Sequence, residues 1–334
     1  MVALYYYLGE KLMKKLSAFI LFITLCFSLV SCGGSGKSQS DTFRVGIIQF
    51  APHPALDAAT EGFQDALKEK LGDKVVFDLK NASGDQANCS TIANGFVNDQ
   101  VDLIMANATP AVNACANATD AIPILGTSVT EYGAALDIDN FSGASGRNVS
   151  GTSDLAPLDE QANMIKSIFP EAKKVGILYC SGEANSKYQV KMISQYLSDL
   201  GLSPAEFAFT DTNDISAVAQ AACDDSDVLF IPTDNKAAEC AETINNVAMN
   251  SKTPIVCGEE NLCKGCGVAT LSISYYDLGY ATGLMAYRIL AEKEDITKMQ
   301  IEYAPETKHE FNPVLAEVYG LSFGSEYEAI DMSE

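Results

Sequence analysis

Short apolar runs alternate with longer amphipathic stretches along most of the chain. The apolar runs are rich in Val, Ile, Leu and Phe, which is typical of buried parallel strands. The amphipathic stretches repeat apolar residues every three or four positions, which predicts helices that bury one face. The expected strands are 43–50, 74–81, 101–107, 122–129, 174–180, 204–210, 228–233, 253–258 and 267–274. The expected helices are 55–72, 85–100, 110–120, 159–169, 185–201, 215–223, 236–250 and 275–293.

The alternation is interrupted once. A stretch rich in Gly, Ser and Asn runs from Asp137 to Ser153, and the pattern then starts again with a helix. Two consecutive β–α series predict an α/β protein with two doubly wound parallel-sheet lobes. We expect the chain to cross between the lobes in the loose stretch. No apolar run after residue 32 has the length of a membrane span.

The amino end has the layout of an export signal. Lys14 and Lys15 precede an apolar run of 15 residues, 16–30, whereas a membrane span needs about 20. Residues 29–32, Leu-Val-Ser-Cys, resemble a lipobox, so we predict a lipoprotein signal peptide over 1–32 with Cys32 as the lipidated residue. An ordinary secretory signal with an incidental cysteine is the alternative. Residues 33–42 read as a flexible tether, and Met13 is a candidate for the true start.

Charge and catalytic motifs narrow the function classes. The net charge of −22 disfavours nucleic acid as a partner, because phosphates would be repelled. The sequence holds no GxxxxGK[ST], GxSxG or HExxH motif. We therefore expect no enzyme activity, no cofactor and no metal.

Eight cysteines follow Cys32, and two of them form a CxxC motif, Cys263-Lys-Gly-Cys266. A metal site would need four ligands, and the chain has only two histidines, neither of them near this motif. A redox motif would be expected at a helix start after the first strand. Small core cysteines or a local disulfide are the favoured interpretation.

Polar residues follow the expected strands in both halves, at the positions where open α/β sheets bind ligands. They would face each other across a cleft between the lobes. The candidate ligand-binding residues are Phe50, His53, Thr109, Ser128, Thr130, Glu183, Asn185, Ser186, Thr233, Asp234, Asn235 and Glu260.

A family resemblance covers 43–290. The segments HPALD, NASGD, ATP, SGEANS, PTDN and YYDLGYATG occur in an order that closely resembles the tryptophan/tyrosine-type substrate-binding proteins of ABC transporters. The resemblance implies a type I periplasmic-binding-protein fold with a hinge of three crossings. It implies one lobe from 43–153 and 275–304, and another from 154–274 and 305–334. One departure is ATLSIS at 269–274, where family members tend to have ATYG.

The resemblance also implies a role. It implies a monomeric extracytoplasmic receptor that captures a small ligand, an aromatic amino acid above all, and passes it to an ABC permease and its ATPase. A lipid anchor at Cys32 would hold it on the membrane. The alternatives are a sensory receptor of the same fold and an exported thiol oxidoreductase that uses Cys263 and Cys266.

An α-amino acid ligand suggests roles for these residues. Its carboxylate would take hydroxyls and N–H groups at a helix start, from Thr109 with the amide of Ala111, and from Ser128 or Thr130. Its ammonium would take Asp234 first, with Glu183 and Glu260 as further choices. Asn185 and Asn235 could bridge either group, and His53 could hydrogen-bond the ligand. Phe50, Tyr132 and Tyr275 are candidate aromatic walls.

Overall fold

The computed structural model describes residues 42–304 and 306–333. Residues 43–334 form one compact unit. The predicted signal peptide, Cys32 and the tether up to residue 41 lie outside the described residues. Among 42–304 and 306–333, none of the helices has the length and apolar character that crossing a bilayer requires.

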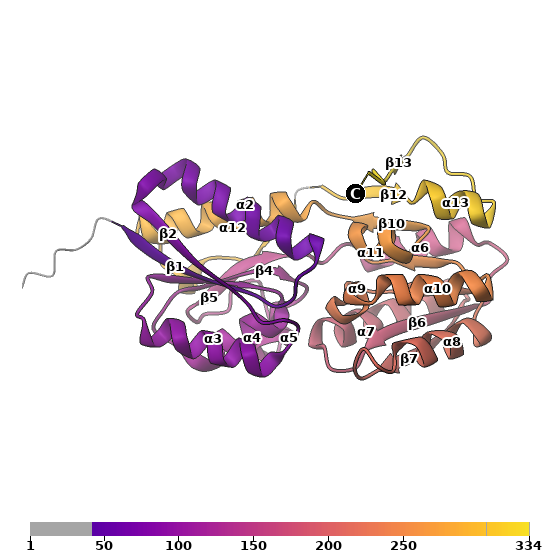
Figure 1. Cartoon of the computed structure of the whole chain (residues 1–334), viewed down its shortest axis with the longest axis horizontal. Helices are drawn as coiled ribbons and strands as arrows, with labels where there is room; N and C mark the ends of the chain where they lie inside the picture. The colour runs from indigo at the N-terminus through magenta and orange to yellow at the C-terminus, as the bar shows by residue number, and fades with distance from the viewer. Residues whose placement is uncertain (1–41, 305, 334) are drawn as a thin grey trace, which may run out of the picture. The chain divides into compact units, whose positions relative to one another are not determined.

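The first half builds a six-stranded, wholly parallel sheet in the order β11-β5-β4-β3-β1-β2. Helices cover both of its faces, with α2 and α12 on one and α3 and α4 on the other (Figure 1). Its strands are β1 (Phe43–Gln49), β2 (Val75–Asn81), β3 (Leu103–Asn107), β4 (Ile124–Val129), β5 (Val149–Ser153) and β11 (Glu302–Tyr303). Its helices are α2 (Pro54–Leu71), η1 (Gly72–Lys74), α3 (Gln86–Asn98), α4 (Thr109–Ala118), α5 (Tyr132–Leu136), α12 (Tyr275–Leu290) and η2 (Ile296–Lys298).

The second sheet has seven strands in the order β13-β12-β10-β9-β8-β6-β7. Five of its strands are parallel, and β12 and β13 run parallel to each other but antiparallel to those five. Its strands are β6 (Lys174–Cys180), β7 (Ser203–Phe209), β8 (Val228–Ile231), β9 (Ile255–Cys257), β10 (Ala269–Ser272), β12 (Lys308–Phe311) and β13 (Tyr327–Ala329). Its helices are α6 (Leu158–Ile168), α7 (Ala184–Asp199), α8 (Ile215–Asp225), α9 (Asn235–Glu239), α10 (Ala241–Ser251), α11 (Glu260–Cys266) and α13 (Pro313–Tyr319).

Separate hydrophobic cores lie on the two faces of each sheet. In the first sheet, Phe96 belongs to the core under α3 and α4, and Phe63 to the core under α2 and α12. In the second, Ile193 of α7 and Ile244 of α10 belong to different cores. This arrangement confirms the predicted α/β class with two doubly wound sheets.

The chain passes between the two sheets after β5, after β10 and after β11. The sequence analysis placed the first passage within residues 137–153, and the structure corrects this. Residues 149–153 form β5, which pairs with β4. The segment Val-Ser-Gly-Thr-Ser lacks the apolar run of the other strands, so its strand character comes from pairing with β4 and β11 and not from its own pattern.

Other elements also differ from the expectation. The helix expected over 236–250 is two helices, α9 and α10, which meet at Cys240. Residues 259–266 lie between two expected strands, and no helix was expected there. They contain α11, which Glu259 caps. The short strands β11, β12 and β13 and the helix α13 had no expected counterpart, because two to seven residues carry too little periodicity to recognise.

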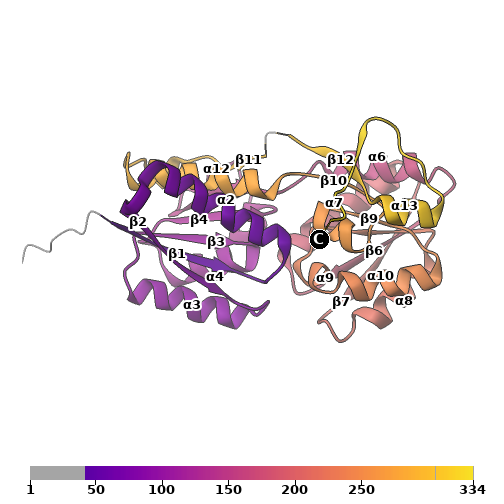
Figure 2. The same cartoon turned by 45° about the horizontal axis from the view of Figure 1, so that its top comes forward.

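Glycines allow α12 to lie directly against α2 (Figure 2). A Cβ at Gly279 would overlap the carbonyl oxygen of Ala59, and one at Gly62 would overlap that of Tyr276. At Gly283 the added carbon would come within 2.7 Å of the Phe63 carbonyl oxygen. The close contact ties the helix that follows β10 to the first helix of the chain.

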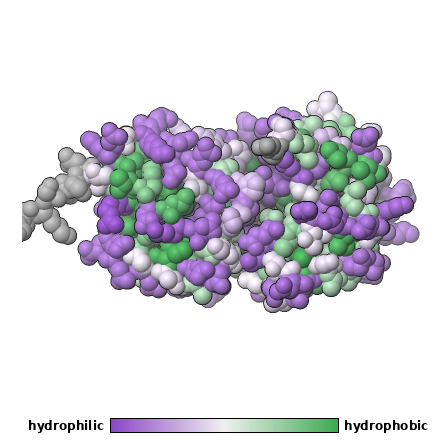
Figure 3. All heavy atoms as spheres, viewed as in Figure 1, coloured by the Kyte–Doolittle hydropathy of each residue, from purple (hydrophilic) through white to green (hydrophobic). Residues whose placement is uncertain are grey.

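Polar side chains dominate the visible surface. Figure 3 shows a mostly hydrophilic face with small, separate hydrophobic patches. This surface agrees with the net charge of −22.

Candidate functional site

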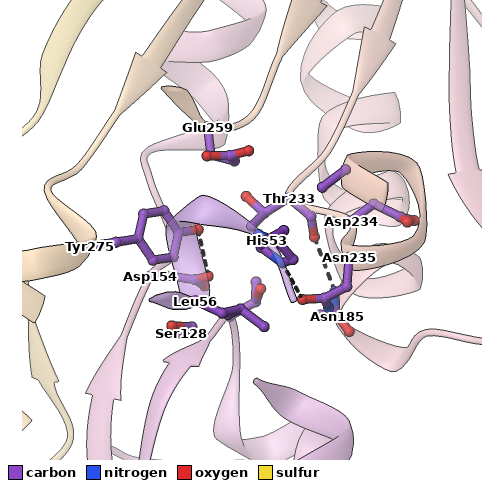
Figure 4. A pocket seen from close by; sticks show the side chains of 12 residues that line it. His53, Leu56, Ser128, Asp154, Asn185, Thr233, Asp234, Asn235, Glu259 and Tyr275 are labelled. Atoms are coloured by element: carbon purple, nitrogen blue, oxygen red, sulfur yellow. Dashed lines mark hydrogen bonds between the residues drawn. The ribbon is translucent and has the colours of Figure 1, made fainter. Parts of the chain in front are cut away.

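One pocket gathers residues from the carboxyl ends of strands in both sheets (Figure 4). The first sheet contributes residues that follow β1, β4 and β5, and the second contributes residues that follow β6, β8, β9 and β10. This is the edge at which parallel α/β sheets bind ligands. The pocket is lined by His53, Leu56, Ser128, Thr130, Asp154, Asn185, Thr233, Asp234, Asn235, Ala238, Glu259 and Tyr275.

Four buried polar atoms of this pocket have no hydrogen-bond partner among the described residues. They are His53 Nδ1, Ser128 Oγ, Asp154 Oδ1 and Asn185 Oδ1. An unpaired buried polar group costs about 1–3 kcal/mol, and folded proteins leave few of them. Their gathering in one pocket therefore indicates a site made to bind a polar ligand.

Asp154 is the charged group of this set. It is 4% exposed and follows β5. The Tyr275 hydroxyl donates a hydrogen bond to Asp154 Oδ2 at 2.9 Å, which leaves Oδ1 free (Figure 4). Burial raises the pKa of Asp154 to about 6, and the hydrogen bond from Tyr275 opposes the rise. At neutral pH the residue is mainly an anion, held in place and ready to accept a hydrogen bond.

Ser128 owes its position to an irregular end of β4. Its φ is 54°, a left-handed conformation that costs a residue other than glycine about 1 kcal/mol or more. The pairing of β4 with β5 shifts register between Gly126 and Val129. Such bulges re-aim side chains, and this one brings the Ser128 hydroxyl to the pocket.

Two hydrogen bonds cross the pocket between the sheets. His53 Nε2 lies 3.3 Å from Asn235 Oδ1, and Gln189 Nε2 donates to Thr130 Oγ1 at 3.5 Å. Because Asn235 Oδ1 can only accept, His53 must carry its proton on Nε2, and Nδ1 is then an acceptor. Burial lowers the pKa of His53, against the effect of Asn235, so its ring is neutral at pH 7.

The carboxylate of Asp234 is committed to the fold. Its Oδ2 accepts hydrogen bonds from the Cys180 amide at 2.6 Å and the Ser186 hydroxyl at 2.7 Å. Its Oδ1 accepts from the Ala237 amide at 2.8 Å, which caps α9. The sequence analysis expected Asp234 to accept the ligand ammonium, but both of its oxygens are bonded here, whereas Asp154 Oδ1 has no partner among the described residues.

Glu183 lies behind the pocket wall and orients two asparagines. It accepts hydrogen bonds from Asn185 Nδ2 at 3.0 Å and from Asn235 Nδ2 at 2.6 Å. Burial, together with the nearby Asp234, raises the pKa of Glu183. Asn185 Nδ2 donates to Glu183 and to the Thr233 carbonyl oxygen. Asn185 Oδ1 has no partner among the described residues.

Four other expected residues are not part of the pocket wall, and one of them is Ser186, whose hydroxyl donates to Asp234 Oδ2. Phe50 is buried, and its ring lies 5.9 Å from Lys236 Nζ. Thr109 is the first residue of α4 and has a buried hydroxyl without a partner among the described residues. Glu260 lines a different cavity. The residue at the capping position of α4 is Ala108, with φ 88°.

The sequence analysis missed Asp154 and Glu259, and it considered Tyr275 only as an aromatic wall. Asp154 follows β5, so recognising that strand would have marked it as a polar strand-end residue. Glu259 was part of the polar segment after β9, but Glu260 was chosen. In the structure Glu259 caps α11, accepting from the Asn261 amide at 2.8 Å and from the Leu262 amide.

Comparison with known proteins identifies the family. The sequence model of the family described as ABC transporter substrate binding protein matches residues 44–319. The chain belongs to this family. The predicted resemblance is confirmed, and proteins of this family bind their solutes outside the cytoplasm.

Individual relatives agree. This ABC substrate-binding protein is 33% identical over 295 residues to the tyrosine-binding protein of Clostridioides difficile (strain R20291), and the match covers 85% of each chain. An ABC domain from Streptococcus pneumoniae in complex with L-Trp superimposes with a TM-score of 0.82 and 30% identity, over 86% of this chain and 100% of that one. A ligand-free, open substrate binding protein with adhesive properties from Clostridium difficile has a TM-score of 0.68 and 33% identity, over 86% of this chain and 99% of that one. The type I periplasmic-binding-protein fold is thereby confirmed.

The cysteines of this substrate-binding protein lie mostly in its hydrophobic cores. The eight within the described residues are free thiols, and all but Cys240 are buried. Burial raises the pKa of Cys257 and of Cys263 well above the ordinary range, which suppresses the nucleophilic thiolate. The described part of the chain contains no group of three or more His, Cys, Asp or Glu residues able to hold a metal ion. These thiols fit the interpretation as small core residues.

The buried carboxyl groups predict a pH dependence of stability. Burial raises the pKa of Glu259 and Glu310 to about 7 and that of Asp154 to about 6. The folded state then binds protons that the unfolded chain releases, so the free energy of unfolding rises as the pH falls from 8 to 5. His53, with its lowered pKa, acts in the opposite direction but is one group against three. Calorimetry should give a melting temperature several degrees higher at pH 5 than at pH 8, and a higher value at pH 8 would contradict this.

Proposed function

We propose that this protein is a lipid-anchored, extracytoplasmic receptor that binds an aromatic amino acid between two lobes and delivers it to an ABC importer. The observation that carries the proposal is the set of four unpartnered polar atoms around Asp154. The names of the relatives support the ligand class, because one is a tyrosine-binding protein and another was solved with L-Trp.

The chemistry of the four atoms fits an α-ammonium group. Asp154 Oδ1, Asn185 Oδ1 and His53 Nδ1 are all acceptors, and an ammonium offers three N–H donors. Asp154 adds the counter-charge that such a buried cation requires. The hydroxyls of Ser128 and Thr130 are then available to donate hydrogen bonds to the ligand carboxylate.

Closure of the lobes would trap the ligand. The pocket has a volume of about 10 Å³, enough for about one water, so its walls must lie further apart than they do here both to admit and to hold an amino acid. The chain has a lower TM-score with the open relative, 0.68, than with the complex of L-Trp, 0.82, although it is more similar in sequence to the open one. We infer that the arrangement of residues 42–304 and 306–333 is the closed one. The bodies that move would be 43–153 with 275–304, and 154–274 with 305–334.

Delivery and anchoring complete the proposal. The family supports a partnership with an ABC permease and its ATPase. The lipobox-like segment at 29–32 supports attachment to the membrane through Cys32. The receptor would act as a monomer.

Ligand binding is the first test. The chain contains no tryptophan, so fluorescence excited at the red edge of tyrosine absorption comes from added L-Trp alone. We expect this emission to change on binding, and L-Tyr and L-Phe to compete with L-Trp. A ligand at 100 times its dissociation constant stabilises the fold by about 2.7 kcal/mol, which raises the melting temperature. Leucine and D-tryptophan are the controls. If none of the aromatic amino acids changes either signal, the proposed ligand class is wrong.

A further inference from the structure

A second cavity lies beside the segment that joins β10 to α12. Its volume is about 450 Å³, within the range of about 300–1,000 Å³ that small-molecule sites occupy. Its walls come from the start of α2, the start of α11, β12 and residues 272–276. We call it the Glu310 cavity.

Glu310 on β12 is a buried carboxylate without a partner. It is 9% exposed, lines the cavity, and makes no hydrogen bond or ion pair with any described residue. Thr270, opposite Glu310 in the β10–β12 ladder, has a buried hydroxyl that also lacks a partner. Burial and the nearby Glu260 raise the pKa of Glu310 to about 7. A cationic group of a ligand that entered the cavity would pair with this carboxylate.

The surroundings of Glu310 are negative. Glu260 lines the same cavity, and no hydrogen bond or ion pair occupies its carboxylate within the described residues. Lys308 also lines it but lies 3.6 Å from Glu328 on the neighbouring strand, which partly neutralises the lysine. Cys263 of α11 is buried nearby with a raised pKa and adds no positive charge. The cavity therefore holds two carboxylates and one lysine, and that lysine is shared with Glu328 on the neighbouring strand.

We propose that the Glu310 cavity binds a small organic diamine, with one amino group on Glu310 and the other on Glu260. A divalent metal fits less well, because no three acidic, histidine or cysteine side chains come together in the described part of the chain. The volume exceeds what a single ammonium group fills. Tyr276, whose ring is partly exposed at the cavity, adds an aromatic surface that favours organic cations.

The diamine would influence the amino-acid site through Tyr275. This residue lines both cavities, and its hydroxyl holds Asp154. A ligand that packs against Tyr275 changes how firmly Asp154 is oriented, and by thermodynamic linkage the amino acid changes diamine affinity by the same factor. This coupling rests on the proposed function, whereas diamine binding itself does not.

Calorimetric titration of the full chain tests the site. The probes are 1,3-diaminopropane, 1,4-diaminobutane and 1,5-diaminopentane, each added without amino acid. We expect one of the three to bind, and the variants Glu310→Gln and Glu260→Gln each to weaken its affinity at least tenfold. Glu317→Gln is the matched control, because Glu317 is exposed on α13 and does not line the cavity. Circular dichroism checks that each variant is folded. Affinity should also increase as the pH rises through 7, when Glu310 ionises.

The outcomes are distinguishable. Absence of diamine binding to the folded wild type, or binding unchanged in both Gln variants, overturns the site. Competition by Ca²⁺ or Mg²⁺ at the same carboxylates overturns the ligand class. A second titration with L-Trp present measures the coupling. If diamines bind while no amino acid does, the Glu310 cavity stands and the proposed function fails.

Discussion

Replacing Asp154 with asparagine is expected to weaken the binding of an aromatic amino acid by about 100-fold or more. Truncating or neutralising one partner of a buried charge pair costs about 2–5 kcal/mol, and about 1.4 kcal/mol corresponds to a factor of ten. In this variant the α-ammonium of the ligand would be buried without its counter-charge. Isothermal titration of the wild type and the variant with L-Trp and L-Tyr measures the change.

Two further variants make this result interpretable. Asp159→Asn alters an exposed carboxylate in the first turn of α6 and should leave affinity unchanged. Tyr275→Phe removes only the hydrogen bond to Asp154 Oδ2 and should give a smaller loss than Asp154→Asn. If Asp154→Asn binds as tightly as the wild type, Asp154 is not the ammonium acceptor.

The protonation of Asp154 adds an independent signature. Its pKa of about 6 means that an increasing fraction of the carboxyl group is neutral as the pH falls from 7 to 5. Ligand affinity in the wild type should decrease over this interval. The Asp154→Asn variant has no proton to gain and should lose this part of the pH dependence.

Replacing Gly279 with alanine is expected to destabilise the fold by about 3 kcal/mol, the upper end of the usual cost of overpacking. The new methyl group would overlap the Ala59 carbonyl oxygen, and a backbone atom of a packed helix cannot rotate away. Helices α2 and α12 would have to separate along their whole contact. Urea unfolding followed by circular dichroism should show a lower midpoint with a similar slope.

Gly95→Ala provides the matched control, because Gly95 also lies inside a helix, α3. An added Cβ there meets nothing within 4 Å. Alanine restricts the unfolded chain and favours helix, so this change should stabilise by about 0.5–1 kcal/mol. If both variants change stability equally, the α2–α12 contact is not as close as the structure indicates.

Much of the architecture could be predicted because the signal is local. A buried parallel strand must be apolar along its length, and a helix that covers a sheet must repeat apolar residues with its own period. These constraints identified β1, α2 and β6 within one residue, and α12 with an end three residues too late. The polar clusters after the strands predicted the edge at which the pocket lies, since the carboxyl ends of parallel strands meet there.

The expectations about β5, Asp154 and Asp234 differ from the structure for one reason: each depends on contacts with residues distant in the sequence. β5 is polar and short, and its strand conformation depends on its two neighbours. Because it was not recognised, Asp154 at its end was not considered. Asp234 looked like a free acid in the sequence, but its oxygens accept hydrogen bonds from the last residue of β6, from α7 and from α9.

The amino-acid sequence by itself therefore determined the fold class, the family and the set of strand ends from which a binding site is built, because these depend on local periodicity and ordered motifs. Only the tertiary structure decided which acidic groups remain available to bind a ligand. Glu183, Asp234 and Glu259 are satisfied by hydrogen bonds within the fold, whereas Asp154 Oδ1 has no partner among the described residues and Glu310 lines a cavity. Hydrogen-bond satisfaction depends on partners distant in sequence, and no pattern of neighbouring residues encodes it.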